Sequence, residues 1–594
     1  MPRLELVETS LRHGQQSLLV SRLRQRHAVP VAAKLDACGF AALDVFGGAT
    51  FEASLRFLAE DPFQRLRAIR RAAPITPLLA WIAGQALVGH RHMPDDVVDT
   101  FIATAADAGI DIFRCYDPLN DVRNLTRCVA AVGATGKLAE GVLVYSGPGA
   151  DGDDETLRVA RRLVDAGFAS LCVHDPLGVL IAPHAAALVR RLREETGVPI
   201  SVSTTAQTGQ ATLVSYMAAT AGAHRIDVAI SPLAGGASMP AAEAVVSGFA
   251  GTEVDPGLDA TAIAAATLEL EQHLVHYADV LDPLAVRVDT SALRGLLPPS
   301  AMGHALAELR ERDALGSLRA VEDEVTRVRR ELGSPPLVSP LTEIIATQAV
   351  YNVVEGDRYA TISQEIKDYF LGLYGSPPLP VDPDVRRLVN GREEPITCRP
   401  ADLLEPALRG ARRELEREGV SPIDDAALVT YALFPAEYLA LARGDAVAEV
   451  LGDEPQTAAP PEAREAAEPA SAENDGPETE ALPVRELTVE VDGQSYAVRV
   501  IGAGGAAPAA SATPQLGGTA AVREGTVVAP MQGLLLKVSV KVGDNVHLGD
   551  VVAVLEAMKM QNDITATRSG TVSRVFAKEG QVVGPRDPIL HIDE

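Results

Sequence analysis

The stretch ASLCVHDPLGVLIAPHAAALVRRLR, residues 169–193, contains the two kinds of element whose alternation decides the fold. Its first part, Ala169–Val173, is a short, mostly apolar run typical of a buried strand. Its last part, Pro183–Arg193, has apolar residues at helical spacing. His174 and Asp175 come directly after the apolar run. The stretch therefore predicts a strand followed by a helix, with polar side chains at the carboxyl end of the strand.

The same strand–helix unit recurs along residues 1–255. Predicted strands start at Leu4, Ala42, Ile75, Ile110, Leu138, Ala169, Pro199 and Arg225. Helical patterns follow the strands, as at Glu155–Asp165. Eight such units within about 250 residues are the number found in a (β/α)8 barrel. We therefore predict an α/β chain that begins with a TIM barrel, with its functional residues at the carboxyl ends of the strands.

The composition indicates a folded, acidic chain of several domains. The 594 residues exceed what one hydrophobic core supports, and 47% of them are hydrophobic. The 80 acidic residues outnumber the 53 basic ones, and the resulting charge of -27 repels nucleic acid. We find neither a signal peptide nor an apolar run of about 18 residues, so we expect no membrane span and a cytoplasmic location. The five cysteines are scattered, and we expect reduced, mostly buried thiols.

The C-terminal residues 524–594 contain an internal repeat with an offset of 37 residues. The matching pairs are Gly533 with Gly570, Val538 with Val575, Gly543 with Gly580, Val546 with Val583, and Asp550 with Asp587. Each half alternates short Val- and Leu-rich strands with turn residues, which predicts a small two-fold sandwich of strands. The halves meet at Glu556–Met560, EAMKM, so Lys559 is expected at a hairpin tip where a modifying enzyme can reach it.

This C-terminal segment resembles the biotinyl and lipoyl carrier family. The tetrapeptide Ala-Met-Lys-Met around Lys559 is the biotin form, and Pro530-Met531 also fits the family. Lipoyl domains, the alternative, usually have Asp before the lysine. The resemblance implies that Lys559 is the covalently biotinylated residue and that a biotin protein ligase is a partner.

Residues 451–523 are rich in Ala, Pro, Glu, Gly and Ser and cannot bury enough apolar surface to fold. We expect a flexible tether that carries the C-terminal domain between two sites. An island at residues 486–501 alternates polar and apolar residues around Asp492-Gly493, which predicts a β-hairpin. Residues 256–450 are predicted to be helical, as at Glu308–Arg312, Glu322–Glu331 and Leu404–Glu416.

Motifs at the predicted strand ends carry a second resemblance. They are Leu11–Leu19 (LRHGQQSLL), Phe46–Phe51 (FGGATF), Phe113–Asp121 (FRCYDPLND), Cys172–Asp175 (CVHD) and Ser231–Gly236 (SPLAGG), with Pro336–Pro340, Thr347–Val350 and Cys398–Leu404 further along. Together these motifs resemble the carboxyltransferase domain of pyruvate carboxylase, the oxaloacetate decarboxylase α subunit and the transcarboxylase 5S subunit. The similarity covers roughly residues 1–450.

The resemblance implies a biotin-dependent carboxyltransferase that moves a carboxyl group between carboxybiotin and a 2-oxo acid. In that family, residues at the positions of Arg12, Gln16 and Arg114 hold the keto acid. The chain contains no specific phosphate-binding loop for an ATP-using module, so a separate biotin carboxylase subunit is an expected partner. The family is usually oligomeric, which implies a homo-oligomer.

The chain departs from the family pattern where the family binds a divalent metal. The four ligand positions are occupied by His13, His174, Ser203 and Thr205, and a threonine that shuttles a proton in the family is replaced by Ala237. A methyl group cannot transfer a proton. His13 and His174 are candidate replacement ligands for zinc or another transition metal, or they fill the space left by the lost ligands.

Three interpretations follow from these departures. The barrel transfers a carboxyl group to a 2-oxo acid, or it is catalytically silent and the chain serves as biotin carrier and scaffold, or it serves a different acceptor without metal. On physical grounds we expect weak or absent metal-dependent decarboxylation of oxaloacetate.

Overall fold

A computed structural model of the 594-residue chain describes most residues of the first 451 and selected strands of the remainder. The described residues are 3–145, 147, 153–281, 285–294, 299–312, 314–451, 484–491, 494–501, 526–529, 533–547, 550–557, 560–566, 568–578, 581–583 and 588–593. The chain divides into two compact units, Met1–Pro455 and Gln456–Glu594.

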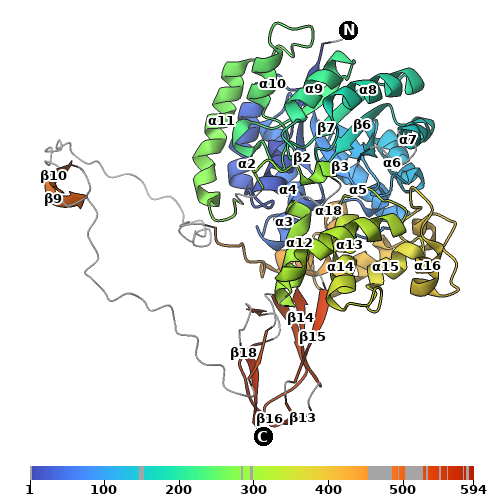
Figure 1. The fold of residues 1–594 in the computed structure, drawn as a ribbon, viewed down its shortest axis with the longest axis vertical. Coiled ribbons are helices and arrows are strands. Elements are labelled where there is room, and N and C mark those ends of the chain that lie inside the picture. Colours follow the sequence, from blue (N-terminus) through green and yellow to red (C-terminus); the bar gives the residue numbers. More distant parts are fainter. Residues whose placement is uncertain are drawn as a thin grey trace. The chain divides into compact units, whose positions relative to one another are not determined.

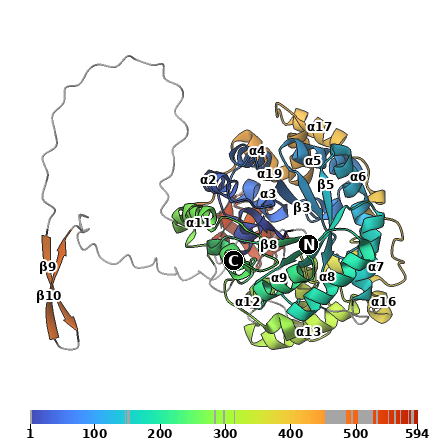
Figure 2. The same ribbon diagram turned by 90° about the horizontal axis from the view of Figure 1, so that it is seen from above.

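Eight parallel strands close into a barrel at the centre of the first unit, which confirms the predicted fold. The strands are β1 Glu5–Glu8, β2 Ala42–Phe46, β3 Leu78–Ile82, β4 Ile112–Cys115, β5 Leu138–Val144, β6 Ser170–Asp175, β7 Ile200–Thr204 and β8 Arg225–Val228. Strand β1 pairs with both β2 and β8, which closes the ring. The helices surround these strands in Figure 2.

The start of β3 differs from the prediction. Ile75 belongs to the preceding loop, where its side chain is 81% exposed and its backbone N–H donates to the Asp36 carboxylate. The strand begins at Leu78, directly after Pro77. The prediction included Ile75 in the strand because the residue is hydrophobic. The strand pairs with its neighbours only from Leu78 onward, where the side chains are buried.

The helices of the barrel follow the predicted alternation (Figure 1). They are α1 Gln15–Leu18, α2 Gln25–Leu35, α3 Gly48–Arg56, α4 Pro62–Ala72, α5 Asp95–Asp107, α6 Thr126–Thr135, α7 Asp154–Asp165, α8 Ala182–Thr196, α9 Ala211–Thr220, α10 Ala242–Phe249 and α11 Ala260–Leu274. In α7 two acidic residues occupy the first turn, which suits the positive end of the helix dipole. Gly197 ends α8 in the left-handed conformation, with φ 69°.

A helical layer follows the barrel within the same unit, as predicted. Its helices are α12 Pro299–Glu311, α13 Leu318–Glu331, α14 Leu341–Val354, α15 Gln364–Phe370, α16 Pro383–Asn390, α17 Leu408–Arg417, α18 Asp425–Leu433 and α19 Pro435–Arg443. Helix α17 starts at Leu408, later than predicted, because residues 404–407 are irregular and the backbone N–H groups of Ala407 and Leu408 donate to the Asp96 carboxylate of α5. Helices α12–α16 share an apolar core of their own around Val325, Ile345 and Tyr369.

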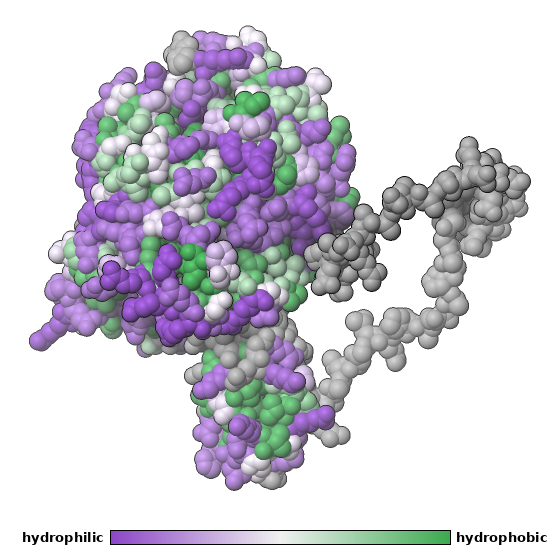
Figure 3. All heavy atoms as spheres, turned by 180° about the vertical axis from the view of Figure 1, so that it is seen from behind, coloured by the Kyte–Doolittle hydropathy of each residue, from purple (hydrophilic) through white to green (hydrophobic). Residues whose placement is uncertain are grey.

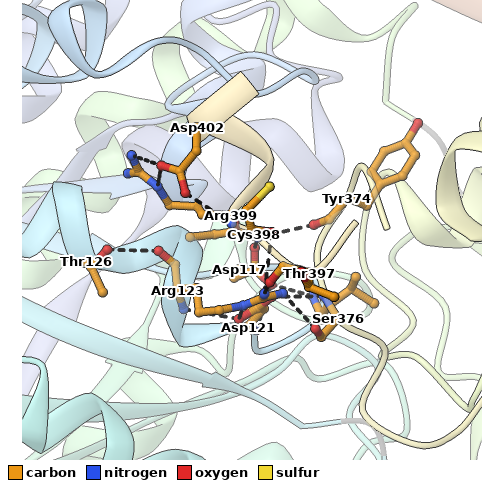
Figure 4. Close-up of polar contacts among 12 residues, drawn as sticks. Asp117, Asp121, Arg123, Thr126, Tyr374, Ser376, Thr397, Cys398, Arg399 and Asp402 are labelled. Atoms are coloured by element: carbon orange, nitrogen blue, oxygen red, sulfur yellow. Dashed lines mark hydrogen bonds and ion pairs between the residues drawn. The ribbon is translucent and has the colours of Figure 1, made fainter. Parts of the chain in front are cut away.

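Ion pairs and hydrogen bonds attach this layer to the barrel (Figure 4). The Arg123 guanidinium donates to the Asp121 carboxylate, to the Ser376 hydroxyl and to the backbone of Thr397. Arg399 pairs with Asp95 of α5 at 2.9 Å. The layer therefore contacts the barrel through charged groups as well as apolar ones.

The second unit contains the predicted two-fold sandwich. Its strands are β11 Thr526–Val528, β12 Gly533–Val538, β13 Asn545–Val546, β14 Val551–Ala557, β15 Met560–Thr565, β16 Gly570–Val575, β17 Val582–Val583 and β18 Pro588–Asp593. One sheet has the order β11-β18-β16-β13 and the other β15-β14-β12-β17. The two orders match when each strand is exchanged for its partner in the repeat, so the sequence repeat is a structural one.

Strands β14 and β15 pair at the join of the two halves, with Ala557 opposite Met560. Met558 and the predicted biotinylation site Lys559 lie outside the described residues. Strands β9 Val484–Val491 and β10 Gln494–Ile501 form the predicted antiparallel hairpin. The predicted tether on either side of that hairpin, residues 452–483 and 502–523, also lies outside the described residues.

Hydrophilic residues cover much of the face of the larger unit seen in Figure 3, and apolar residues are scattered among them. Among the described residues, no helix has both the length and the apolar character needed to cross a membrane. Four of the five cysteines are buried and Cys398 is exposed, all as free thiols.

Candidate active site at the barrel mouth

Arg12 lies in the short helical turn that follows β1, Ser10–Gly14, and its side chain is buried against β2. Its Nε lies 2.7 Å from both carboxylate oxygens of Asp44. Its Nη1 lies 3.4 Å from Oε1 of the exposed Gln16. Gly47 makes this placement possible, because a Cβ there would lie 2.8 Å from Cδ of Arg12. Two of the predicted site residues, Arg12 and Gln16, are thus in contact.

Arg114 of β4 is completely buried inside the barrel. Its Nε donates to Glu140 of β5, and its Nη1 donates to Asp227 of β8 at 2.5 Å. Glu140 also accepts a hydrogen bond of 2.7 Å from the Ser201 hydroxyl. Burial opposes ionisation of Glu140, but the Arg114 guanidinium holds the pKa of that carboxyl below its ordinary value. Arg114 is therefore a fixed cation within a charged network.

The ring of Trp81, in β3, lies close to the side chains of Arg12, Arg114 and His174. The centre of its ring lies 4.8 Å from the guanidinium carbon of Arg12 and 5.3 Å from that of Arg114. The His174 ring lies 4.8 Å from it on a tilted plane. Arg12, Arg114 and His174, three residues singled out from the sequence, therefore gather around one indole.

His174 of β6 is buried, and its Nδ1 lies 3.2 Å from the Ser203 hydroxyl on β7. The two residues are direct neighbours in the register of β6 and β7. Burial, reinforced by Arg12 and Arg114, lowers the pKa of His174 to about 3. Burial and Arg12 also lower the pKa of His13 well below its ordinary value, with His174 adding to the effect. Both imidazoles are therefore neutral at physiological pH.

Two of the four positions that the resemblance aligns with the family's metal ligands bear hydroxyl groups that are hydrogen-bonded within the protein. Ser203 is engaged with His174, and the Thr205 hydroxyl donates to the Pro176 carbonyl at 3.2 Å. Only His13 and His174 of the four bear ring nitrogens suited to a transition metal. Within the described part of the chain, no group of three His, Cys, Asp or Glu residues is arranged to bind one.

Ala237, at the position where the resemblance implies a proton-shuttling threonine, lies in the loop after β8. Its backbone N–H donates to the Ala285 carbonyl at 2.8 Å. The neighbouring Ser238 hydroxyl donates to the Leu233 carbonyl at 2.6 Å. This loop therefore presents a methyl group, and its adjacent hydroxyl is already used by the backbone.

Several partners in this site were missed by the sequence analysis: Asp44, Glu140, Asp227 and Trp81. The signal for two of them was available, because Asp44 interrupts the otherwise apolar strand ALDVF and Asp227 lies between Ile226 and Val228 in the strand RIDV. Burial raises the pKa of Asp44 to about 7 against the opposing effect of Arg12. The site thus combines two guanidinium groups, their buried carboxylates and two neutral imidazoles.

Comparison with protein families matches three parts of the chain. Residues 3–268 match the HMGL-like model, residues 301–499 match the conserved carboxylase domain, and residues 525–592 match the biotin-requiring enzyme model. Together these models span the barrel, the helical layer with the hairpin, and the C-terminal sandwich.

Individual relatives extend this match over the whole chain. A pyruvate carboxylase subunit of Methanocaldococcus jannaschii is 36% identical over 94% of this chain and 94% of its own length. The 2-oxoglutarate carboxylase large subunit of Hydrogenobacter thermophilus is 33% identical over 100% of this chain and 96% of its own. The carboxyl transferase domain of Rhizobium etli pyruvate carboxylase, solved with pyruvate and biocytin, superimposes with a TM-score of 0.70 at 28% identity, covering 75% of this chain and 77% of that one. The chain belongs to the family of biotin-dependent carboxyltransferases that includes these pyruvate and 2-oxoglutarate carboxylase subunits, with a carboxyltransferase barrel and a biotin domain on one polypeptide.

Proposed function

We propose that the chain transfers a carboxyl group between carboxybiotin attached to Lys559 and a small 2-oxo acid bound at the barrel mouth. The observation that carries the proposal is the contact of Arg12 with Gln16 beside the Trp81 ring that Arg114 also approaches. Guanidinium groups suit the planar carboxylate of such an acid. The names of the relatives, pyruvate carboxylase and 2-oxoglutarate carboxylase, support the same class of acceptor.

The proposal divides the chain into four parts. Residues 1–255 form the carboxyltransferase barrel, 256–450 the helical region, 451–523 the tether with its hairpin, and 524–594 the biotin carrier. A biotin protein ligase attaches the cofactor, and a separate biotin carboxylase subunit loads it. The names of the relatives describe them as single subunits of a carboxylase, which supports that division of labour. We also propose a homo-oligomer, by resemblance to the family.

No step of the proposed reaction uses a divalent metal, because the residues at the expected ligand positions do not fit one. The chain's own groups bind and orient the acceptor: Arg12 and Arg114 supply positive charge, and buried Asp44, Glu140 and Asp227 fix their orientation. Ala237 and the altered ligand positions favour one alternative, in which the barrel is silent and the chain acts as biotin carrier and scaffold.

Isotope exchange tests this function with the full chain alone. The chain is coexpressed with a biotin protein ligase, and intact-mass analysis confirms biotinylation. Labelled pyruvate is then incubated with oxaloacetate, and labelled 2-oxoglutarate with its carboxylated product. A transferase that carries the carboxyl group on biotin moves label between the two acids of one pair.

Lys559→Arg is the matched control, since it keeps the charge of the lysine and removes the biotin attachment point. We expect exchange with the biotinylated chain and none with Lys559→Arg. If the biotinylated chain exchanges label with neither pair, the carrier-and-scaffold alternative replaces the proposal.

A further inference from the structure

Two buried N–H donors at the barrel mouth have no hydrogen-bond partner within the described part of the chain. They are Nε1 of Trp81, a residue that is 5% exposed, and Nη2 of Arg114, which is fully buried. Buried N–H groups in native proteins are almost always paired, because an unpaired one loses its hydration without compensation. Two such donors in one cluster indicate that a bound molecule supplies the acceptor atom for them.

The donors belong to the same cluster of side chains. The Arg114 guanidinium carbon lies 5.3 Å from the centre of the Trp81 ring, and its other nitrogens are already bonded to Glu140 and Asp227. Arg12 approaches the same ring, at 4.8 Å. Both guanidinium groups are already paired with buried carboxyl groups, of Asp44, Glu140 and Asp227, so the unused N–H groups rather than a net positive charge favour an oxygen acceptor at this point.

The unused donors also argue against a metal at this point. An indole or guanidinium N–H has no lone pair to offer a cation. Asp227 Oδ1 and Glu8 Oε2 are unpaired acceptors among the described groups, but each belongs to a carboxyl whose other oxygen is hydrogen-bonded. The His174 Nδ1 is likewise occupied by Ser203.

We propose that the Trp81 indole N–H and the Arg114 Nη2 N–H form a binding site for one oxygen of a small planar 2-oxo acid. These two donors supply to that oxygen, through hydrogen bonds, the stabilisation of negative charge that a divalent metal supplies in the resembling family, in the manner of an oxyanion hole. This inference rests on the proposed function and deepens it, because it says how the acceptor is held.

Trp81 is the only tryptophan of the chain, so its fluorescence reports directly on the site. The probes are oxamate and oxalate, which are unreactive planar analogues of a 2-oxo acid and of its enolate, and acetate, which has a carboxylate alone. The full chain is titrated with each probe in the presence of a chelator, and calorimetry gives the dissociation constants.

We expect oxamate and oxalate to change the Trp81 emission without metal, and acetate to bind much more weakly. Trp81→Phe keeps an aromatic ring in the barrel core but removes the N–H. Because a hydrogen bond to a charged acceptor is lost, its affinity for oxalate should fall about 10-fold or more, as measured by calorimetry. Tyr369→Phe is the matched control, since it removes the hydroxyl of a buried aromatic residue in the helical layer and should leave the affinity unchanged.

Three results would overturn the inference: no probe binds to the wild-type chain, Trp81→Phe binds oxalate as tightly as wild type, or chelation abolishes binding and added magnesium or zinc restores it. Far-ultraviolet circular dichroism confirms that each variant is folded. The isotope exchange described above is a separate measurement. If oxalate binds through Trp81 while biotin-dependent exchange is absent, the proposed function fails and the binding site stands.

Discussion

Replacing Glu8 by glutamine tests how the barrel holds a carboxyl group that has no ion pair among the described residues. Glu8 ends strand β1, and its Oε1 accepts hydrogen bonds from the backbone N–H groups of Ser10 and Ile230, at 2.9 and 3.3 Å. Its other oxygen is buried without a partner within the described part of the chain. Burial, only partly offset by these hydrogen bonds, raises the pKa of Glu8 to about 7.

The sign of the pH effect follows from this raised pKa. Between pH 4.5 and about 7 the folded state keeps a proton on Glu8 that the unfolded chain has released. The free energy of unfolding therefore decreases as the pH rises through this window. Across this window the titration of Glu8 alone lowers the free energy of unfolding by about 3 kcal/mol. The full decrease is reached only above pH 7.

Glu8→Gln removes the titration and keeps the shape of the side chain. We expect the variant to be less dependent on pH than wild type between pH 5 and about 8, with its advantage over wild type growing toward the alkaline end. Urea unfolding followed by Trp81 fluorescence measures the stability of the barrel itself. Glu271→Gln, at an exposed position of α11, is the control and should follow wild type at every pH. A stability difference between Glu8→Gln and wild type that is the same at pH 5 and pH 8 would refute the reasoning.

Four further predictions address the site, the cofactor and the architecture. Gly47→Ala places a Cβ 2.8 Å from Cδ of Arg12, so it should displace that side chain and weaken oxamate binding about 10-fold, measured by calorimetry; unchanged affinity would show that Arg12 does not hold the ligand. Adding magnesium, manganese or zinc should leave oxaloacetate decarboxylation by the purified chain as slow as with a chelator, and a metal-dependent increase in rate would contradict this. Arg399→Ala removes the ion pair with Asp95, which should cost about 1 kcal/mol and lower the melting temperature of this large unit by only about 1 °C in scanning fluorimetry, with earlier proteolysis of the helical layer as the more sensitive measurement. Lys559→Arg should abolish the mass increase on coexpression with biotin protein ligase, whereas Lys541→Arg in the same unit should retain it.

The elements of the barrel could be predicted closely because strands buried on both faces are continuous apolar runs. Strands β2, β5 and β8 begin at the predicted residues Ala42, Leu138 and Arg225. The prediction failed at Ile75, where an apolar residue is exposed in a loop, since hydrophobicity does not say which side of a chain faces the core.

The two-fold sandwich was determined by the sequence alone. A repeat with one offset requires equivalent strands to occupy equivalent places, and the two sheet orders show this equivalence. The departures from the family pattern could also be recognised from the sequence alone, because they are the residue types at His13, His174 and Ala237.

Only the tertiary structure decided which groups neutralise one another. Arg114 pairs with Asp227 across 113 positions of sequence, and Arg12 with Asp44 across 32. Trp81, whose ring is close to both arginines and to His174, was not predicted as a site residue, because a single aromatic residue in an apolar strand is typical of ordinary core. Closure of the barrel brings residues from separate strands to one face, so the partners of a buried charge depend on strand order and register, which no local pattern in the sequence contains.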